Sequence, residues 1–198
     1  MADEKGGQAT GPKGEVELIE LGQDQQSFAR RVAESKATIP HVYFTQGITA
    51  QAGRGALIAA VARALRETPR LNSAYRDGSV EVYSRVNVAF AVEHAGSTTH
   101  PVIRDADQKD AQAIEREIAE LEQGARDGSL ASPAFTGATF TVVELGTSGV
   151  SGYAPIIARG QAATLGVGTE SLTLACDHRV VQDSAGAEFL RLVASLLP

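Results

Sequence analysis

The hydrophobic positions of this chain change from a strand period to a helix period near the C-terminus. Leu172, Leu174 and Cys176 recur at every second residue, which predicts a strand with one buried face. From Ser184 onward the apolar residues recur at helical spacing, which predicts a helix with Asp183 or Ser184 as its N-cap. A polar segment therefore separates a buried strand from the start of a helix.

The same two periods run through the rest of the chain. They predict helices over residues 25–36, 53–65 and 110–122, and strands over residues 15–21, 41–47, 80–83, 86–92, 100–104, 138–145 and 163–167. Asp77-Gly78 predicts a tight turn, and the Gly/Ser-rich segment 146–152 predicts a loop, because it lacks the lysine of a phosphate-binding loop. Strands and helices alternate irregularly, so we expect an α+β fold with a mixed β-sheet in a two-layer sandwich.

Composition narrows the class of protein. The chain has 198 residues, 43% of them hydrophobic, and a net charge of −6 with both signs interspersed, which is unlike a basic nucleic-acid footprint. The sequence contains neither a membrane-spanning apolar run nor a signal-peptide core. Its single cysteine, Cys176, lies on an apolar strand face and fits a cytoplasmic protein. We expect a disordered leader at residues 1–14 and one domain over residues 15–198.

The polar segment after the C-terminal strand contains the main catalytic candidate. His178 lies between a buried strand and a helix start, where the backbone is fixed, and histidine titrates near neutral pH. These properties suit a general base. A single histidine in a loop is also often an ordinary polar residue, so spacing alone leaves both interpretations open.

A family resemblance supports the catalytic interpretation. The run Asp177-His178-Arg179-Val180-Val181, followed by Gly186-Ala187 and Phe189-Leu190, resembles the active-site signature of the dihydrolipoamide acyltransferases. These proteins form the catalytic core of the 2-oxoacid dehydrogenase complexes and share the fold of chloramphenicol acetyltransferase. Further matching segments occur in the family's order at residues 29–31, 35, 39–41, 69–73, 101–107, 140–142, 155–157 and 165–168.

The resemblance implies a reaction, a partner and an assembly. An acyl group would move between coenzyme A and a thiol or hydroxyl acceptor, with His178 as the general base and acyl-CoA as a co-substrate. The family fold implies a homotrimer in which the histidine of one subunit faces its neighbour. His41 would order the turn after the first helix. No metal is implied, and the sequence shows no lipoyl domain, so we expect a stand-alone core that acts on a small-molecule substrate.

Two supporting positions depart from the family pattern. The fourth and fifth residues after the histidine, Asp and Gly in the family, are Gln182 and Asp183 here, while Arg179 is retained. The family's oxyanion-stabilising serine falls at Val143. Thr141 shares the strand face of Val143, and Thr147 and Ser148 follow in the next loop, so these hydroxyls are the replacement candidates. Two family segments, before residue 53 and between residues 168 and 172, are shortened.

Three functional hypotheses follow. The first is a stand-alone acyltransferase that moves an acyl group from acyl-CoA to a small-molecule acceptor, in a biosynthetic setting. The second keeps His178 for another base-assisted step, such as elimination or cyclisation. The third is a non-catalytic assembly protein. His178 counts against the third hypothesis, and Val143 counts against the first.

Overall fold

The computed structural model describes residues 10–49, 52–94, 97–145 and 148–198, and its centre is one six-stranded mixed sheet. Three neighbouring strands run parallel and the outer pairs are antiparallel. In spatial order the strands are β3 (His41–Gly47), β12 (Ser171–Asp177), β11 (Ala163–Val167), β10 (Phe140–Glu144), β6 (Val88–Phe90) and β9 (Val102–Ile103).

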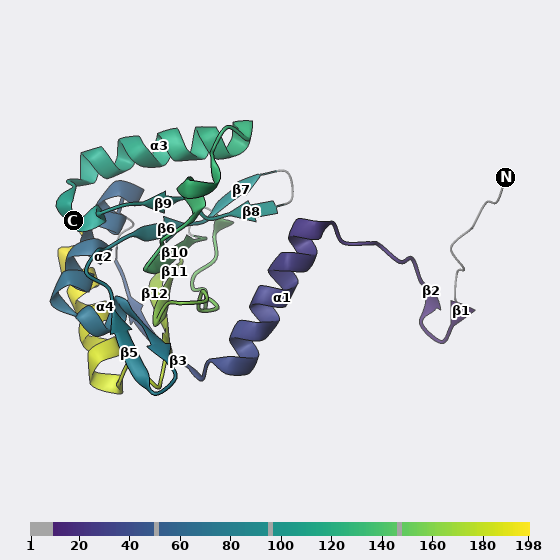
Figure 1. The fold of residues 1–198 in the computed structure, drawn as a ribbon, viewed down its shortest axis with the longest axis horizontal. Coiled ribbons are helices and arrows are strands. Elements are labelled where there is room, and N and C mark those ends of the chain that lie inside the picture. The colour runs from purple at the N-terminus through teal and green to yellow at the C-terminus, as the bar shows by residue number, and fades with distance from the viewer. Residues whose placement is uncertain (1–9, 50–51, 95–96, 146–147) are drawn as a thin grey trace.

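Three helices cover one face of this sheet (Figure 1). They are α2 (Arg54–Glu67), α3 (Ala111–Asp127) and α4 (Asp183–Leu196), and their apolar faces form one core with alternate residues of the strands. On β10, for example, Phe140 and Val142 belong to this core, so Thr141 and Val143 face the other side of the sheet. Gly186 allows α4 to pack closely, because an added Cβ would lie 2.5 Å from the Phe44 ring on β3.

The helix α1 (Gln23–Thr38) lies on the opposite side of the molecule, and the chain before it runs outward from the body (Figure 1). Ahead of α1, β1 (Thr10–Gly11) and β2 (Gly14–Glu15) form a small hairpin. The strand predicted over residues 15–21 is wrong, because only Glu15 of that range is in a strand. Residues 1–9 lie outside the described residues, so the leader over 1–14 and the domain start at 15 stay predictions.

Two further hairpins complete the fold. β4 (Ser73–Arg76) and β5 (Ser79–Val82) are joined by Asp77 and Gly78, which both have positive φ, as the predicted tight turn requires. β7 (Val92–His94) pairs with β8 (Ser97–Thr99). The strand predicted over residues 86–92 is therefore two short strands, β6 and β7, and the one predicted over 100–104 is only β9.

The α+β fold class with a mixed sheet and two layers is confirmed. β3 and β11 have the predicted bounds, and Cys176 is fully buried as expected. Residues 168–170 alone connect β11 to β12, and the described residues between β3 and α2 contain no helix. The connection between β11 and β12 is thus short, as the sequence suggested, whereas residues 50 and 51 of the other segment lie outside the described residues.

His41 holds α1 and β3 to the segment that crosses the sheet. Its Nδ1 lies 2.8 Å from the Ile39 carbonyl and must donate, so Nε2 is the acceptor for the Ile157 N–H at 3.1 Å. Ser35 of α1 donates to the Ile157 carbonyl at 2.7 Å. His41 is thus structural, as the sequence implied.

We expect the free energy of unfolding to fall as the pH drops below 6.5. Burial is the main cause that lowers the pKa of both His41 and His100 from 6.5, so the unfolded chain binds these protons first. Each histidine contributes a slope of at most about 1.4 kcal/mol per pH unit. Urea denaturation between pH 7.5 and 5.5 measures the slope. His41→Asn should lower stability at pH 7.5 and flatten the pH dependence; an unchanged slope would contradict this role.

Candidate active site

His178 lies immediately after β12, in the connection to α4. Its N–H donates to the Pro40 carbonyl at 3.0 Å, which fixes the backbone, and its Nδ1 lies 3.2 Å from the Val181 carbonyl. Because a carbonyl only accepts, Nδ1 carries the proton and the neutral ring has its lone pair on Nε2. The side chain is 50% exposed, so Nε2 is accessible from outside the chain. This is the tautomer that a general base needs.

An ion pair between the two neighbours of His178 braces this segment. Arg179 donates from Nε and Nη2 to the two carboxylate oxygens of Asp177, at 2.9 and 2.7 Å, and its backbone N–H donates to the same carboxylate. The guanidinium also stacks on the Tyr75 ring, 4.1 Å from its centroid. The supporting role predicted for Arg179 is therefore structural within the chain. Tyr75 was missed, because nothing local in the sequence ties the β4–β5 hairpin to this ion pair.

Arg179→Ala should destabilise the fold by about 3 kcal/mol, because it leaves the carboxylate of Asp177 buried and without its cation. Asp177 is 2% exposed, whereas the Arg179 side chain is 34% exposed. The matched variant Asp177→Asn leaves a guanidinium that water reaches, and it should cost less. Urea denaturation of both variants checks the order; an equal or reversed cost would mean that the buried carboxylate does not depend on Arg179.

Gln182 and Asp183 stand where the family has its aspartate and glycine. The N-cap of α4 is Gln182, and within the described chain its side chain makes no capping hydrogen bond. Asp183 is the first helical residue, so its predicted role as the N-cap is wrong by one position. Its carboxylate lies 3.9 Å from Nε2 of His178, close enough to attract the imidazolium when the base is protonated.

A cavity of about 550 Å³ is lined by residues of β10 and α1, together with the start of α2 at Arg54 and the end of α3 at Glu122 and Arg126. Its floor includes Thr141 and Val143 of β10, and one wall is the segment from Tyr153 to Arg159. Gly166 allows that segment to approach, because an added Cβ would lie 2.2 Å from the Tyr153 carbonyl oxygen. Cavities of this size commonly bind small molecules.

The three predicted replacement hydroxyls have different positions. Thr141 is buried and its hydroxyl donates to Oε1 of Gln161 at 2.9 Å, so its proton is already engaged. Ser148 lines the cavity and is exposed, and Thr147 lies outside the described residues. Gln161 was missed, since it is far from Thr141 in sequence.

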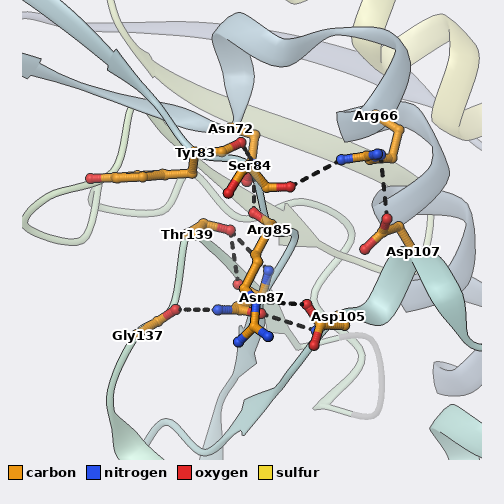
Figure 2. Close-up of polar contacts among 10 residues, drawn as sticks. All are labelled: Arg66, Asn72, Tyr83, Ser84, Arg85, Asn87, Asp105, Asp107, Gly137 and Thr139. Carbon is orange, nitrogen blue, oxygen red and sulfur yellow. Dashed lines mark hydrogen bonds and ion pairs between the residues drawn. The ribbon is translucent and has the colours of Figure 1, made fainter.

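Figure 2 shows a network of polar contacts around Asn72 and Asn87. Asn87 joins three segments: its side chain accepts from Asp105 N–H, donates to the Gly137 carbonyl, and its backbone N–H donates to Thr139, which precedes β10. Tyr83 donates to the Gly160 carbonyl at 2.9 Å, directly beside Gln161. Asn72, Asn87 and Asp105 are therefore not among the residues that line the cavity.

His178 does not reach this cavity within one chain. Thr141 pairs with Thr164, and Thr164 pairs with Ala175, three residues before His178. Two strand spacings and three residues along β12 separate the two positions by roughly 14 Å, and Val143 is roughly 19 Å from His178 by the same reckoning. Groups that act on one reacting atom lie within about 3 Å of it. Within one chain His178 and the cavity are therefore apart, and we refer to them as the two half-sites.

Comparisons with known proteins identify the fold and the family of this chain. A chloramphenicol acetyltransferase superposes with a TM-score of 0.53 at 11% identity, which shows the fold. Residues 55–171 match the family described as 2-oxoacid dehydrogenases acyltransferase (catalytic domain), a match that ends before His178. The chain belongs to this family, and its general kind is an acyltransferase.

Two curated relatives and two solved structures are similar to it. Two dihydrolipoyllysine-residue acetyltransferase components of pyruvate dehydrogenase complexes, one from Rickettsia bellii and one from Arabidopsis thaliana, are each 32% identical to this chain over 82% of its length. The chain spans 48% and 38% of their lengths. A probable dihydrolipoamide acetyltransferase from Listeria monocytogenes has a TM-score of 0.87 at 26% identity, covering 91% of this chain and 94% of that one.

The second structure, a dihydrolipoamide acetyltransferase from Azotobacter vinelandii, also has a TM-score of 0.87 at 26% identity, over 93% of this chain and 92% of that one. It was used to study a serine, a histidine and an asparagine in the catalytic mechanism, with the asparagine four positions after the histidine.

Within the part of the chain that the structure describes, neither a metal site nor a membrane-spanning helix is supported. No group of three or more His, Cys, Asp or Glu residues there is arranged to hold a metal ion. No helix among the described residues is long and apolar enough to cross a membrane.

Proposed function

We propose that the chain transfers an acyl group between coenzyme A and a thiol acceptor, with His178 as the general base. The observation that carries the proposal is the tautomer of His178: Nδ1 donates to the Val181 carbonyl and leaves Nε2 accessible. In the Azotobacter enzyme the asparagine stands four positions after the histidine, and Gln182 has this spacing here. Gln182 keeps an amide at that position.

The acceptor that we favour is a dihydrolipoyl thiol. The relatives reported above are named for dihydrolipoyl substrates, whereas the sequence had suggested a small-molecule acceptor for a stand-alone enzyme. The second candidate keeps that small acceptor, and Val143 favours it, because an apolar residue stands where the family has its oxyanion hydroxyl.

The proposed reaction uses two side chains of this chain, His178 and Asp183. Nε2 of His178 takes the proton from the acceptor thiol, the sulfur attacks the thioester carbonyl carbon, and the electron pair moves onto the carbonyl oxygen. Collapse of this intermediate expels the thiolate of coenzyme A, which recovers the proton from the imidazolium. Asp183, 3.9 Å from Nε2, stabilises the imidazolium while it exists.

The working form that we propose is a homotrimer in which His178 of one subunit enters the cavity of the next. The separation of the half-sites supports this proposal, because a second copy could bring His178 to a cavity that it does not reach in its own chain. The segment from residue 16 to residue 22, which we call the N-terminal arm, exposes Leu18 by 85% and Ile19 by 78%, which suits contact with another copy. A structure similar to this chain is the cubic core of the pyruvate dehydrogenase multienzyme complex, and a cube has a three-fold axis through each corner.

Acyl exchange tests the proposal. The purified chain is supplied with acetyl-CoA and either dihydrolipoamide or a panel of small hydroxyl and thiol acceptors, and free coenzyme A is measured. Consumption with dihydrolipoamide supports the first candidate, and consumption with a hydroxyl acceptor alone supports the second. Consumption with none of them, together with no acetyl-CoA binding, would overturn acyl transfer and favour the other base-assisted chemistry considered for His178.

A further inference from the structure

We propose that His100 donates the hydrogen bond to the thioester oxyanion that the family's serine donates and that Val143 lacks. The proposal rests on the acyl transfer proposed above. It assigns a catalytic contact to a residue outside the family signature, on a different strand pair from His178.

When the registers of β6 with β10 and of β7 with β8 are continued by one residue, His100 and Val143 fall in one row on either side of Ala91, although neither Ala91 nor His100 is itself in a strand. Ala91 lies beside Val143, because β6 and β10 pair with Phe90 opposite Val142 and the Ala91 N–H donates to the Val142 carbonyl. Ala91 also lies opposite His100, between the pairs Val92 with Thr99 and Phe90 with Pro101. Residues in one row of a sheet project from the same face.

That face is the one with the cavity. Val143, Ala91 and His100 all line it. Two strand spacings separate Val143 from His100 by roughly 10 Å, and the residue between them in the row, Ala91, has only a methyl side chain. A carbonyl oxygen held above Ala91 lies between the position of the missing hydroxyl and the imidazole.

His100 is held as a neutral donor. It is half-buried, and burial together with the positive charge of Arg31 lowers its pKa. A neutral imidazole keeps one N–H, which donates without a change of protonation state. The N–H accepts no proton and loses none in the step: it stabilises the charge when the carbonyl pair moves to oxygen and releases the oxygen when the C=O bond re-forms.

The hydroxyls near Val143 fit this role less well. The proton of Thr141 is engaged by Gln161 at 2.9 Å, so donation to substrate would break that buried hydrogen bond. Ser148 is exposed and lies five residues along the chain from Val143, past the end of β10. His100 is the half-buried donor in the row itself.

A double-mutant cycle tests the inference. His100→Val should lower kcat by about 10²-fold, the usual effect of removing one oxyanion donor, while KM changes little. Val143→Ser returns the family hydroxyl, and in the His100→Val background it should restore most of the lost rate. His94→Val is the matched control: it removes an exposed histidine from the same β7–β8 hairpin and should keep the wild-type rate.

The outcomes separate this inference from the function on which it rests. If wild type exchanges acyl groups and His100→Val does so at the same rate, His100 is not the donor and the inference fails. The same holds if Ser148→Ala loses the rate and His100→Val does not, or if Val143→Ser gives no rescue while both variants remain folded by circular dichroism. Absence of acyl exchange in wild type would instead overturn the proposed function.

Discussion

Replacing His178 with alanine is expected to lower kcat by about 10³-fold, the scale of general-base catalysis. The side chain is 50% exposed, and among the described residues its hydrogen bond is to the Val181 carbonyl, so its loss should leave stability nearly unchanged. The measurement is acyl exchange with acetyl-CoA, together with urea denaturation. His94→Ala serves as the control, since His94 is an exposed histidine distant from the β12–α4 connection.

Two results would contradict the role of His178. A variant with the wild-type rate would remove the general base, since no proton acceptor would be missing. A variant that unfolds would show that the ring is structural, as His41 is.

Mixing two inactive variants is expected to restore activity if the site is shared between copies. His178→Ala lacks the base but keeps the cavity, and Ala91→Phe keeps the base but fills the cavity that Ala91 lines. In trimers assembled from equal amounts, a site works when an intact His178 meets an intact cavity, which happens for about a quarter of the sites. Each variant alone should remain near background.

The mixture must be co-expressed or refolded together, so that mixed trimers form, and each variant must elute as a trimer by itself. If the site lay within one chain, every chain in the mixture would carry one defect and no rate would return. A stable monomer of the wild-type chain, found by sedimentation, would also rule out the shared site, because no second copy would be present. Within one chain Val143 and His178 lie roughly 19 Å apart.

The parts of the fold that the sequence predicted are those with a local signal. β11 follows from a short apolar run and β12 from its alternating apolar residues, but the prediction that β12 has only one buried face is wrong, because every residue from Leu172 to Asp177 is buried. The turn at Asp77-Gly78 follows from the positive φ that these residues adopt. The strand predicted over residues 15–21, which include most of the N-terminal arm, is wrong because alternation alone does not show what buries the apolar residues. Residues 15–21 alternate like a strand, but they leave Leu18 and Ile19 exposed, which is consistent with burial supplied by another copy.

The residues of the candidate site likewise differ in whether the local sequence indicates them. His178 was found because the family signature surrounds it in sequence. His100 was read only as the start of a strand, since its alignment with Val143 comes from two registers, β6 with β10 and β7 with β8. Gln161 and Tyr75 were missed because each meets its partner, Thr141 or Arg179, only through long-range folding.

The position of β12 has a consequence for the order of events during synthesis. This last strand lies between β3 and β11, and Tyr43 pairs with Ala175 across about 130 residues of chain. At 5–20 residues per second, β3 waits on the order of ten seconds on the ribosome before its partner exists. The apolar side chains of Val42 and Phe44 have no sheet to join during that time. Nascent chains paused before residue 171 should therefore depend on chaperones far more than chains paused after the complete α4 has emerged.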